Sequence, residues 1–455
     1  MIEDFKHILK PNQVETTAKE IVQYGTDRTG FYSSNPLCVL FPESTADVSA
    51  ILRYCSEKNY PVVPSAGRTG LSGAAVAQNK EVIISFERMN SISDIDILGE
   101  TVEAEAGVIL ENLQQAVQEK GLYFPLDFAA KGSCMIGGCI STNAGGVKVL
   151  KYGMTRNLVL GLEVVLANGT VLNLNTALIK DNSGYDLKQL FIGAEGTLGL
   201  ITKARLKCIQ PPTNTHVALL QLASFDNAPK TLAKMQNAMD VLAFEYMDAY
   251  SVSATLKAMP QLRFPFDTYM HTVLVEVSEK NKDLLEELIF QLAEQHFILD
   301  GCIASNSAEE HMFWSLRESA SDSIYLNGTV HANDISVPIS NLTHFLAELE
   351  ILLRKHYTAY AVAIFGHIGD GNLHIYIIDE RGRDKPTWKA DMNALDEHMF
   401  TLVQNYQGSI SAEHGIGLLK KGALTYRRSE KELQLMRQLK ATLDPFSILN
   451  PGKIL

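Results

Sequence analysis

Three glycine-rich segments lie within the first 202 residues, and they constrain the fold of this chain more than any other feature. They span residues 64–75, 131–146 and 193–202. Glycine lets the backbone approach a phosphate closely, and successive N–H groups in such turns can form a concave anion-binding site. Three loops of this kind would be costly in conformational entropy if they bound nothing. The N-terminal half therefore predicts a nucleotide site, and it suits a flavin nucleotide.

The spacing of these glycines excludes the two commonest nucleotide-binding motifs. A Rossmann fold needs G-x-G-x-x-G between a strand and a helix, and no such pattern occurs here. The Walker P-loop pattern is absent as well. The predicted nucleotide site therefore belongs to another architecture.

Length and composition describe a globular chain of several domains. The 455 residues exceed one ordinary core, so length alone predicts about three domains. The chain is 46% hydrophobic and 20% charged, which is typical of soluble globular proteins. Its formal net charge of −12 argues against a general nucleic-acid surface, which needs a basic patch.

The sequence carries no signal for export or membrane insertion. The first ten residues lack the long apolar core and the cleavage site of a signal peptide, and no window approaches 18 consecutive apolar residues. The six cysteines show no C-x-x-C pattern, which favours reduced thiols. We therefore expect a cytoplasmic location.

Hydrophobic patterning predicts alternating strands and helices before residue 210. The run that begins at Cys38 predicts a strand, and Ser44 or Thr45 can cap the helix that follows it. Residues 162–174 predict a hairpin, because Asn168-Gly169 lies between two apolar runs. Beyond the Pro-Pro pair at 211–212, strands alternate with longer helical patterns, which indicates a second, α+β domain.

Two histidines and a neighbouring Glu-His pair form a candidate metal site in the C-terminal part. His367 and His374 flank a Gly-Asp-Gly-Asn turn, and Glu413 precedes His414 in S-A-E-H-G-I-G. Residues seven apart in one straight strand face opposite ways, but a turn lets both rings converge. Two imidazoles and a carboxylate suit a divalent ion such as zinc and leave a coordination position open. The remaining imidazole is then a candidate base for proton abstraction.

Four motifs, in order along the chain, resemble those of known flavoproteins. They are P-S-A-G-R-T-G-L-S-G-A, K-G-S-C-M-I-G-G-C-I-S-T-N-A-G-G, G-A-E-G-T-L-G-L-I-T and D-P-F-S-I-L-N-P-G-K. The N-terminal half resembles the vanillyl-alcohol-oxidase-type (PCMH-type) FAD-binding fold. The C-terminal half resembles the FAD-linked oxidase C-terminal domain of D-lactate, glycolate and D-2-hydroxyglutarate dehydrogenases. The resemblance implies an α+β fold class, with an FAD-binding domain and an α+β substrate cap domain built on an antiparallel sheet.

The resemblance also implies a domain organisation. We expect an FAD-binding domain over residues 1–210, with its core at 34–210. A substrate or cap domain over 211–425 would carry the metal site, and a segment over 426–455 would return to the FAD domain.

The resemblance further implies the cofactor contacts. The first loop would surround the FAD pyrophosphate, the second would line the flavin and ribityl chain, the third would meet the adenine, and an asparagine near the C-terminus would return to the flavin. The implied residues are Pro64, Gly67, Arg68, Thr69, Gly70, Ser72, Gly73, Pro125, Gly132, Ser133, Gly137, Gly138, Ser141, Thr142, Asn143, Gly146, Gly199, Ile201 and Asn450. Covalent relatives carry a histidine in the first loop, and this chain has Arg68-Thr69 there, so we expect non-covalent FAD.

For the C-terminal half, the resemblance implies metal ligands, a base and a substrate arginine. His367, His374 and Glu413 would bind the metal, and His414 would be the general base. Arg317 in F-W-S-L-R-E matches the arginine of the W-x-x-R-E motif, and a planar guanidinium suits a carboxylate. Ser321, one turn later, would share its helix face.

One position departs from the hydroxyglutarate pattern. The family carries a lysine two residues before the aspartate of D-[IL]-S-[VL]-P, and this chain has Ala332 before Asp334. The second carboxylate of a dicarboxylic substrate therefore lacks its usual cation, unless His331 compensates. D-2-hydroxyglutarate and D-lactate are the expected substrates, and glycolate or another 2-hydroxy acid stays open.

The predicted function is oxidation of a D-2-hydroxy acid to the 2-oxo acid, with hydride transfer to flavin N5. Electrons would pass to an external acceptor, such as an electron-transfer flavoprotein, a quinone or a cytochrome. An oxygen-using oxidase and a non-catalytic flavoprotein subunit of a larger assembly are the alternatives. We expect no nucleic-acid partner and no integral membrane segment, and a homodimer is one oligomeric state that the sequence leaves open.

Overall fold

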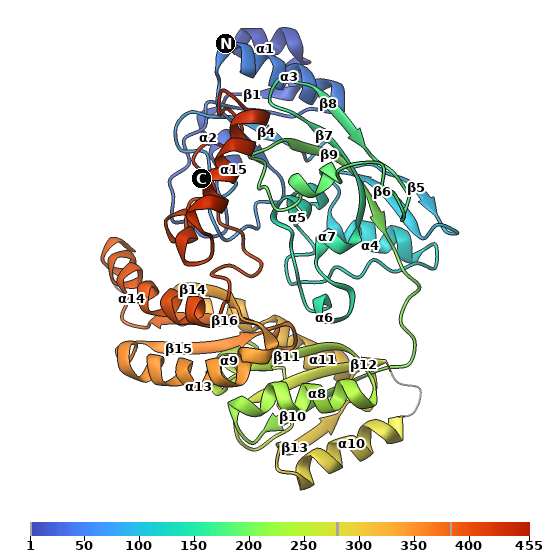
Figure 1. The fold of residues 1–455 in the computed structure, drawn as a ribbon, viewed down its shortest axis with the longest axis vertical. Coiled ribbons are helices and arrows are strands. Elements are labelled where there is room, and N and C mark those ends of the chain that lie inside the picture. Colours follow the sequence, from blue (N-terminus) through green and yellow to red (C-terminus); the bar gives the residue numbers. More distant parts are fainter. Residues whose placement is uncertain (1, 279–281, 383–384) are drawn as a thin grey trace. The chain divides into compact units, whose positions relative to one another are not determined.

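The computed structural model describes residues 2–278, 282–382 and 385–455. The chain forms two compact units, and Figure 1 shows the elements of each. The first unit comprises Met1–Gly145, Tyr152–Pro211 and Glu413–Leu455, and the second comprises Gly146–Lys151 and Pro212–Ala412. The chain thus returns to the first unit at Glu413, earlier than the expected residue 426.

Hydrogen bonds inside the first unit explain this early return. The N–H groups of Ile416 and Gly417 donate to the carboxylate of Glu195, at 2.7 and 2.8 Å. The N–H groups of Leu418 and Leu419 donate to the carbonyl of Ser72. The segment that follows Glu413 is therefore bound to the glycine-rich loops well before residue 426.

The first unit contains two sheets. One has the order β1-β2-β4-β3, in which β2, β4 and β3 run parallel and β1 is antiparallel to β2. The other has the order β5-β6-β9-β7-β8 and is antiparallel. The strands are β1 (Val14–Glu15), β2 (Cys38–Leu40), β3 (Val62–Ser65), β4 (Val82–Ser85), β5 (Ile92–Asp96), β6 (Thr101–Glu105), β7 (Val159–Val165), β8 (Val171–Leu174) and β9 (Leu200–Lys207).

Helices of the first unit bury one apolar face against these sheets. The described helices are α1 (Ile2–Ile8), α2 (Ala18–Ile21), α3 (Thr45–Lys58), α4 (Leu110–Gln118), α5 (Ile136–Thr142), α7 (Thr155–Leu158) and α15 (Glu430–Leu443), and α6 (Val149–Tyr152) lies where the chain changes units. Short 3-10 turns are η1 (Pro11–Gln13), η2 (Val22–Gly25), η3 (Leu187–Leu190) and η6 (Lys421–Tyr426). Helix α3 begins as expected, because the Ser44 side chain accepts the N–H of Asp47.

The second unit is built on one antiparallel sheet with the order β13-β10-β12-β11-β15-β16-β14. Its strands are β10 (Thr215–Leu222), β11 (Asp240–Met247), β12 (Thr272–Ser278), β13 (Ile298–Ile303), β14 (Thr329–Ser336), β15 (Ala361–Gly366) and β16 (Asn372–Asp379). Its helices are α8 (Ala228–Ala238), α9 (Ala249–Ala258), α10 (Lys282–Glu294), α11 (Ser307–Glu318), α12 (Ala320–Tyr325), α13 (Ile339–His356) and α14 (Lys385–Asn405), with 3-10 turns η4 (Phe225–Asn227) and η5 (Ile368–Asp370). The antiparallel sheet expected of a cap domain is present.

Helices cover both faces of this sheet. On one face α9, α11 and α12 share an apolar core with the sheet, which includes Leu316, Phe365 and Tyr376. On the other face α8, α10, α13 and α14 pack together and against the strands (Figure 1). Side chains from one face of β11, β14, β15 and β16 therefore point toward α11 and α12, and this face carries most of the candidate site.

Among the described residues, the structure contains no helix that is long and apolar enough to cross a membrane.

Candidate active site

The three glycine-rich segments meet inside the first unit. A Cβ added to Gly67 in the first segment would overlap the carbonyl oxygen of Ser133 in the second. The N–H of Glu195, in the third segment, donates to the carbonyl of Ser141 at 2.8 Å. The third segment also reaches the first, because a Cβ on Gly196 would meet the Pro64 ring. At Gly67 and Gly196 the neighbouring segment therefore leaves no space for a side chain.

Asn450 joins this cluster from the far end of the chain. Its N–H donates to the carbonyl of Val62 on β3 at 2.7 Å. Its side-chain amide donates to the carbonyls of Ala74 and Glu195, at 3.0 and 2.7 Å. Asn450 therefore binds both the first and the third glycine-rich segments.

The first segment has free space and an available hydroxyl for a phosphate. A Cβ on Gly70 would meet no atom within 4 Å. The hydroxyl of Ser72 is buried, and it has no hydrogen-bond partner in the part of the chain that the structure describes. A buried hydroxyl without a partner costs free energy unless a ligand supplies one. These residues fit the pyrophosphate of FAD.

Several predicted FAD residues also have contacts within the protein. The Arg68 guanidinium lies 4.8 Å from the Tyr24 ring centroid and donates to the Ala66 carbonyl. The Thr142 hydroxyl donates to the Gly138 carbonyl, and Asn143 ends α5 in the left-handed conformation. Gly146 belongs to the second unit. The cofactor contacts assigned to individual residues stay predictions.

In the second unit, a tight turn brings the two predicted histidine ligands together. Gly371 takes a φ of +86°, and a Cβ there would overlap the Val337 carbonyl, so the turn requires glycine. Asp370 accepts the N–H of Asn372 at 3.1 Å and acts as a turn residue, as expected. The rings of His367 and His374 lie 5.4 Å apart between centroids, and a nitrogen of each lies within 4.8 Å of the other.

A buried carboxylate lies behind each of these histidines. His367 Nδ1 is 2.9 Å from Glu245 Oε1. His374 Nδ1 is 3.5 Å from Asp334 Oδ1, which also accepts a hydrogen bond from Asn372. A carboxylate at Nδ1 favours the tautomer whose lone pair is on Nε2, and such partners are usual behind histidine ligands. The donor set therefore fits a divalent ion.

Glu413 and His414 directly follow the last residue of the second unit. The N–H of Ala412 donates to Asp334 Oδ2 at 3.0 Å, and Ser409 pairs with Ser336. Within the first unit, the Glu413 carboxylate lies against Gly145, where a Cβ would overlap it. The carboxylate that binds the loop after His414 is Glu195, and burial raises its pKa to about 7 although two N–H donors oppose the shift.

Arg317 is buried on the same face of the sheet as the histidines. Its Nη2 lies 2.8 Å from Glu245 Oε2, and its Cζ lies 5.3 Å from the Phe365 ring centroid. Nη2 is engaged by this ion pair, whereas Nε has no hydrogen-bond acceptor among the described residues. Nε is therefore a donor suited to a substrate carboxylate.

Ser321 contributes a second polar group on this face. Its hydroxyl lies 3.1 Å from the Tyr376 hydroxyl, and the Tyr376 ring packs on Phe365. Ala332 stands opposite Tyr376 in the β14–β16 register, so both side chains point to the same face. The position of the missing family lysine is therefore next to two hydroxyl groups.

His331 has a different environment from Ala332. Successive side chains in a strand point to opposite faces. His331 Nε2 lies 2.8 Å from Asp396 on α14, which also accepts from Asn333. The idea that His331 replaces the lysine stays a prediction, and this geometry weighs against it.

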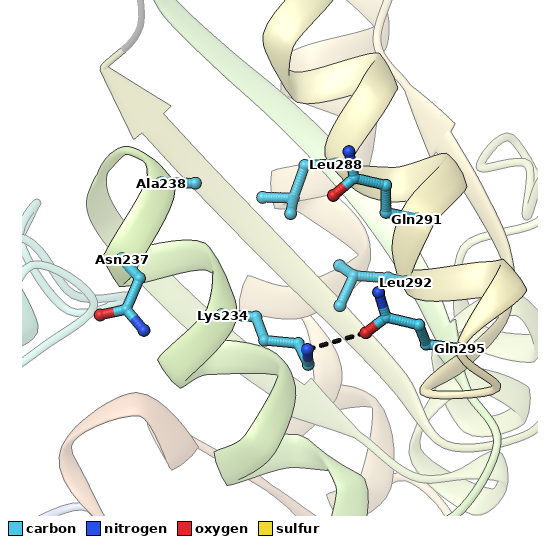
Figure 2. Close-up of a pocket in the computed structure, with 7 residues that line it drawn as sticks. All are labelled: Lys234, Asn237, Ala238, Leu288, Gln291, Leu292 and Gln295. Carbon is cyan, nitrogen blue, oxygen red and sulfur yellow. Dashed lines mark hydrogen bonds between the residues drawn. The ribbon is translucent and has the colours of Figure 1, made fainter.

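The second unit also contains a cavity of about 260 Å³ between α8 and α10. Figure 2 shows its lining, in which Lys234 donates to Gln295 at 2.7 Å. The lining residues are Lys234, Asn237, Ala238, Leu288, Gln291, Leu292 and Gln295. None of the predicted site residues lies among them, so this cavity is not a candidate active site.

Sequence reasoning missed Glu245 and Glu195. Glu245 is the one acidic residue inside the apolar run V-L-A-F-E-Y-M, and Glu195 lies between small residues in G-A-E-G-T. A carboxylate in an apolar or glycine-rich context is costly to bury without partners. That signal could have marked both residues, although not their partners.

Two protein-family models match this chain. Residues 36–175 match the FAD binding domain, and residues 211–454 match the C-terminal domain of FAD linked oxidases. D-2-hydroxyglutarate dehydrogenase of Stutzerimonas stutzeri (strain A1501) is 40% identical over 100% of this chain and 98% of its own length. The mitochondrial D-2-hydroxyglutarate dehydrogenase of Bos taurus is 38% identical over 98% of this chain and 81% of its own length.

Solved structures show the same fold at low sequence identity. p-Cresol methylhydroxylase with substrate bound superimposes with a TM-score of 0.78 at 15% identity, over 100% of this chain and 96% of that one. Alkyldihydroxyacetonephosphate synthase superimposes with a TM-score of 0.73 at 17% identity, over 99% of this chain and 85% of that one. The predicted PCMH-type fold class is confirmed.

A PCMH-type fold with converging glycine-rich loops defines the class, an FAD-dependent oxidoreductase. Within that class, the match over residues 211–454 and the relatives that cover the whole chain identify the family. The chain belongs to the FAD-linked oxidases.

Proposed function

We propose that this protein is an FAD- and metal-dependent dehydrogenase that oxidises a D-2-hydroxy acid to the 2-oxo acid. One observation carries the proposal. The buried Arg317 shares the Glu245 carboxylate with His367, and its Nε has no hydrogen-bond acceptor among the described residues. This arrangement suits an anionic substrate beside a cation.

Arg317 binds the carboxylate of the substrate and fixes the orientation of its C2 carbon. His414 takes the proton of the C2 hydroxyl as general base, and proton removal favours departure of the C2 hydrogen as hydride. Buried side chains around Arg317 exclude water from the reacting atoms. FAD bound at the glycine-rich segments would supply the hydride acceptor, and a metal held by His367, His374 and Glu413 would supply polarisation of the hydroxyl.

The proposed metal ligands are His367, His374 and Glu413. The two imidazoles converge within the second unit, each with a carboxylate at Nδ1. Ala412 is hydrogen bonded to Asp334, and one peptide bond joins Ala412 to Glu413. Zinc suits this donor set.

The substrate is either a short monocarboxylic acid such as D-lactate or a dicarboxylic acid such as D-2-hydroxyglutarate. The names of the relatives favour the dicarboxylic acid. Ala332, beside the hydroxyls of Ser321 and Tyr376, favours an uncharged end of the substrate. Turnover would also require an external acceptor for the electrons that the flavin receives.

The test is anaerobic reduction of the flavin by a panel of D- and L-2-hydroxy acids. We expect bleaching by D-enantiomers only, and its loss after treatment with a chelator. Stopped-flow reoxidation by oxygen compared with a dye or quinone distinguishes an oxidase from a dehydrogenase. If no 2-hydroxy acid bleaches the flavin, the protein is a non-catalytic flavoprotein and the proposal is wrong.

A further inference from the structure

Glu245 connects the histidine turn with the helix that carries Arg317. It lies on β11, which pairs with β15 so that Tyr246 stands opposite Gly366. The same antiparallel register directs Glu245 toward His367, which follows Gly366. The Glu245 side chain is buried, with 1% relative exposure. A carboxylate at this depth requires charged or hydrogen-bonding partners.

Its two oxygens serve two different side chains. Oε1 lies 2.9 Å from His367 Nδ1 in a hydrogen bond. Oε2 lies 2.8 Å from Arg317 Nη2. One buried carboxylate therefore contacts both the histidine and the arginine.

The contact between Glu245 and His367 fixes the tautomer of the imidazole ring. The other oxygen of Glu245 faces the Arg317 guanidinium, so Glu245 acts as the acceptor in its hydrogen bond with His367. Nδ1 then donates, and a neutral imidazole in this tautomer has its lone pair on Nε2. The contact also limits rotation of the ring. Both effects prepare His367 to bind a metal through Nε2.

The contact between Glu245 and Arg317 fixes the plane of the guanidinium group. Arg317 is held between the Glu245 carboxylate and the Phe365 ring. A guanidinium with a fixed plane presents its remaining donors in one direction, which reduces the entropy lost when a carboxylate binds.

We propose that Glu245 is a positioning residue that orients the histidine ligand and the substrate arginine with one carboxylate. This role rests on the proposed function, because it takes His367 as a metal ligand and Arg317 as the substrate anchor. In this role Glu245 acts through His367 and Arg317. Metal binding and carboxylate binding are therefore coupled through a single buried side chain.

The test replaces Glu245 in the full chain loaded with FAD and uses readouts that do not depend on turnover. For Glu245→Gln we expect zinc affinity, measured by competition with a chelator, to fall about 10- to 100-fold. We also expect metal-free protein to bind pyruvate and 2-oxoglutarate at least about 10-fold more weakly, as measured by the perturbation of flavin absorbance. Glu245→Asp keeps the negative charge but shortens the side chain by one methylene group. Both affinities should therefore fall by less than they do in Glu245→Gln.

The matched control is Glu276→Gln. Glu276 is a buried carboxylate on the neighbouring strand β12, and it is paired with Lys148 and Trp314 instead of His367 and Arg317. We expect wild-type zinc and 2-oxo-acid affinities in this variant. Retained FAD and a cooperative thermal transition establish that each variant folds, and if Glu245→Gln does not fold, Glu245→Asp decides the outcome.

Loss of only one of the two affinities in the Glu245 variants would overturn the dual role. Equal zinc and 2-oxo-acid affinities in the Glu245 and Glu276 variants would overturn any positioning role for Glu245. Both results leave the proposed function intact if the wild type binds zinc and its flavin is reduced by a 2-hydroxy acid. A wild type that does neither contradicts the proposed function itself, and the role of Glu245 fails with it.

Discussion

At the scale of single residues, the proposed site assigns metal binding and proton transfer to different groups. His367 lies in the turn beside His374, whereas His414 follows Glu413 in the chain. Their substitution should therefore have different consequences. His414→Ala should keep FAD and metal, but the substrate should reduce its flavin about 10²- to 10⁴-fold more slowly. This is the usual effect of losing a general base.

His367→Ala should lose the metal instead, and a high concentration of added metal should restore part of the rate. Elemental analysis together with the anaerobic half-reaction measures both variants. A His414 variant that lacks metal yet reduces flavin once zinc is restored would show that the roles of base and ligand are reversed.

A second residue-scale prediction concerns Ala332, which points to the same face as Ser321 and Tyr376. Ala332→Lys should shift preference toward a dicarboxylic 2-hydroxy acid by about 10- to 100-fold, because a charge-assisted contact contributes about 1.5–3 kcal/mol. The ratio of kcat/KM for D-2-hydroxyglutarate and D-lactate measures this shift. Gln291→Lys, which adds the same charge on α10, should leave the ratio unchanged, and an unchanged ratio in Ala332→Lys would place the distal carboxylate elsewhere.

At the scale of elements, the crossing of the first two glycine-rich segments leaves no space for a side chain. A Cβ on Gly67 would lie 2.8 Å from Cys134 Cα and closer still to the Ser133 carbonyl. Gly67→Ala should therefore destabilise the FAD-free protein by about 1–3 kcal/mol, as overpacking does, and weaken FAD binding.

Gly70→Ala is the matched control, because its Cβ meets no protein atom within 4 Å. It should weaken FAD binding while the stability of the FAD-free protein stays at the wild-type value. Urea unfolding and FAD titration of the two variants make the comparison. Equal stability of both FAD-free variants would contradict the close contact between the segments.

The loop after His414 gives an element-scale prediction about pH. Burial raises the pKa of Glu195 to about 7, so the folded protein binds more protons than the unfolded chain from about pH 4.5 to pH 7. Stability contributed by Glu195 should therefore fall as pH rises through this window, by about 3 kcal/mol at most, and level off above it.

Glu195→Gln isolates this effect. The amide loses an acceptor for Ile416 or Gly417 at a cost that does not depend on pH. The advantage of the wild type over the variant should therefore shrink between pH 5 and pH 8 in urea unfolding experiments. A constant difference across this range would mean that Glu195 does not titrate there.

At the scale of the whole molecule, local features could be predicted and long-range ones could not. The cap at Ser44 and the hairpin at Asn168-Gly169 depend on neighbours in sequence, and both occur as predicted. The convergence of His367 and His374 follows from the turn between them. The role of Glu245 depends on pairing between β11 and β15, which lie more than 100 residues apart, and no local pattern encodes that pairing.

The whole molecule should release its cofactor on denaturation. The first glycine-rich segment has Arg68 and Thr69 where covalent relatives carry a histidine, so we expect only non-covalent contacts to retain FAD. Acid precipitation of the yellow protein should leave free FAD in the supernatant, which absorbance and chromatography identify. Flavin that stays in the pellet would contradict this prediction.

The position of Asn450 has a consequence for folding. Its side-chain amide contacts Ala74 across 376 residues and Glu195 across 255. Such contacts give the first unit a high contact order, and forming them requires closure of very long loops. During synthesis, the nascent chain contains both sheets of this unit before residue 450 is made. The cluster of glycine-rich segments therefore lacks its Asn450 contacts until then. We therefore expect cofactor binding to follow synthesis of the second unit, although that unit supplies none of the Asn450 contacts.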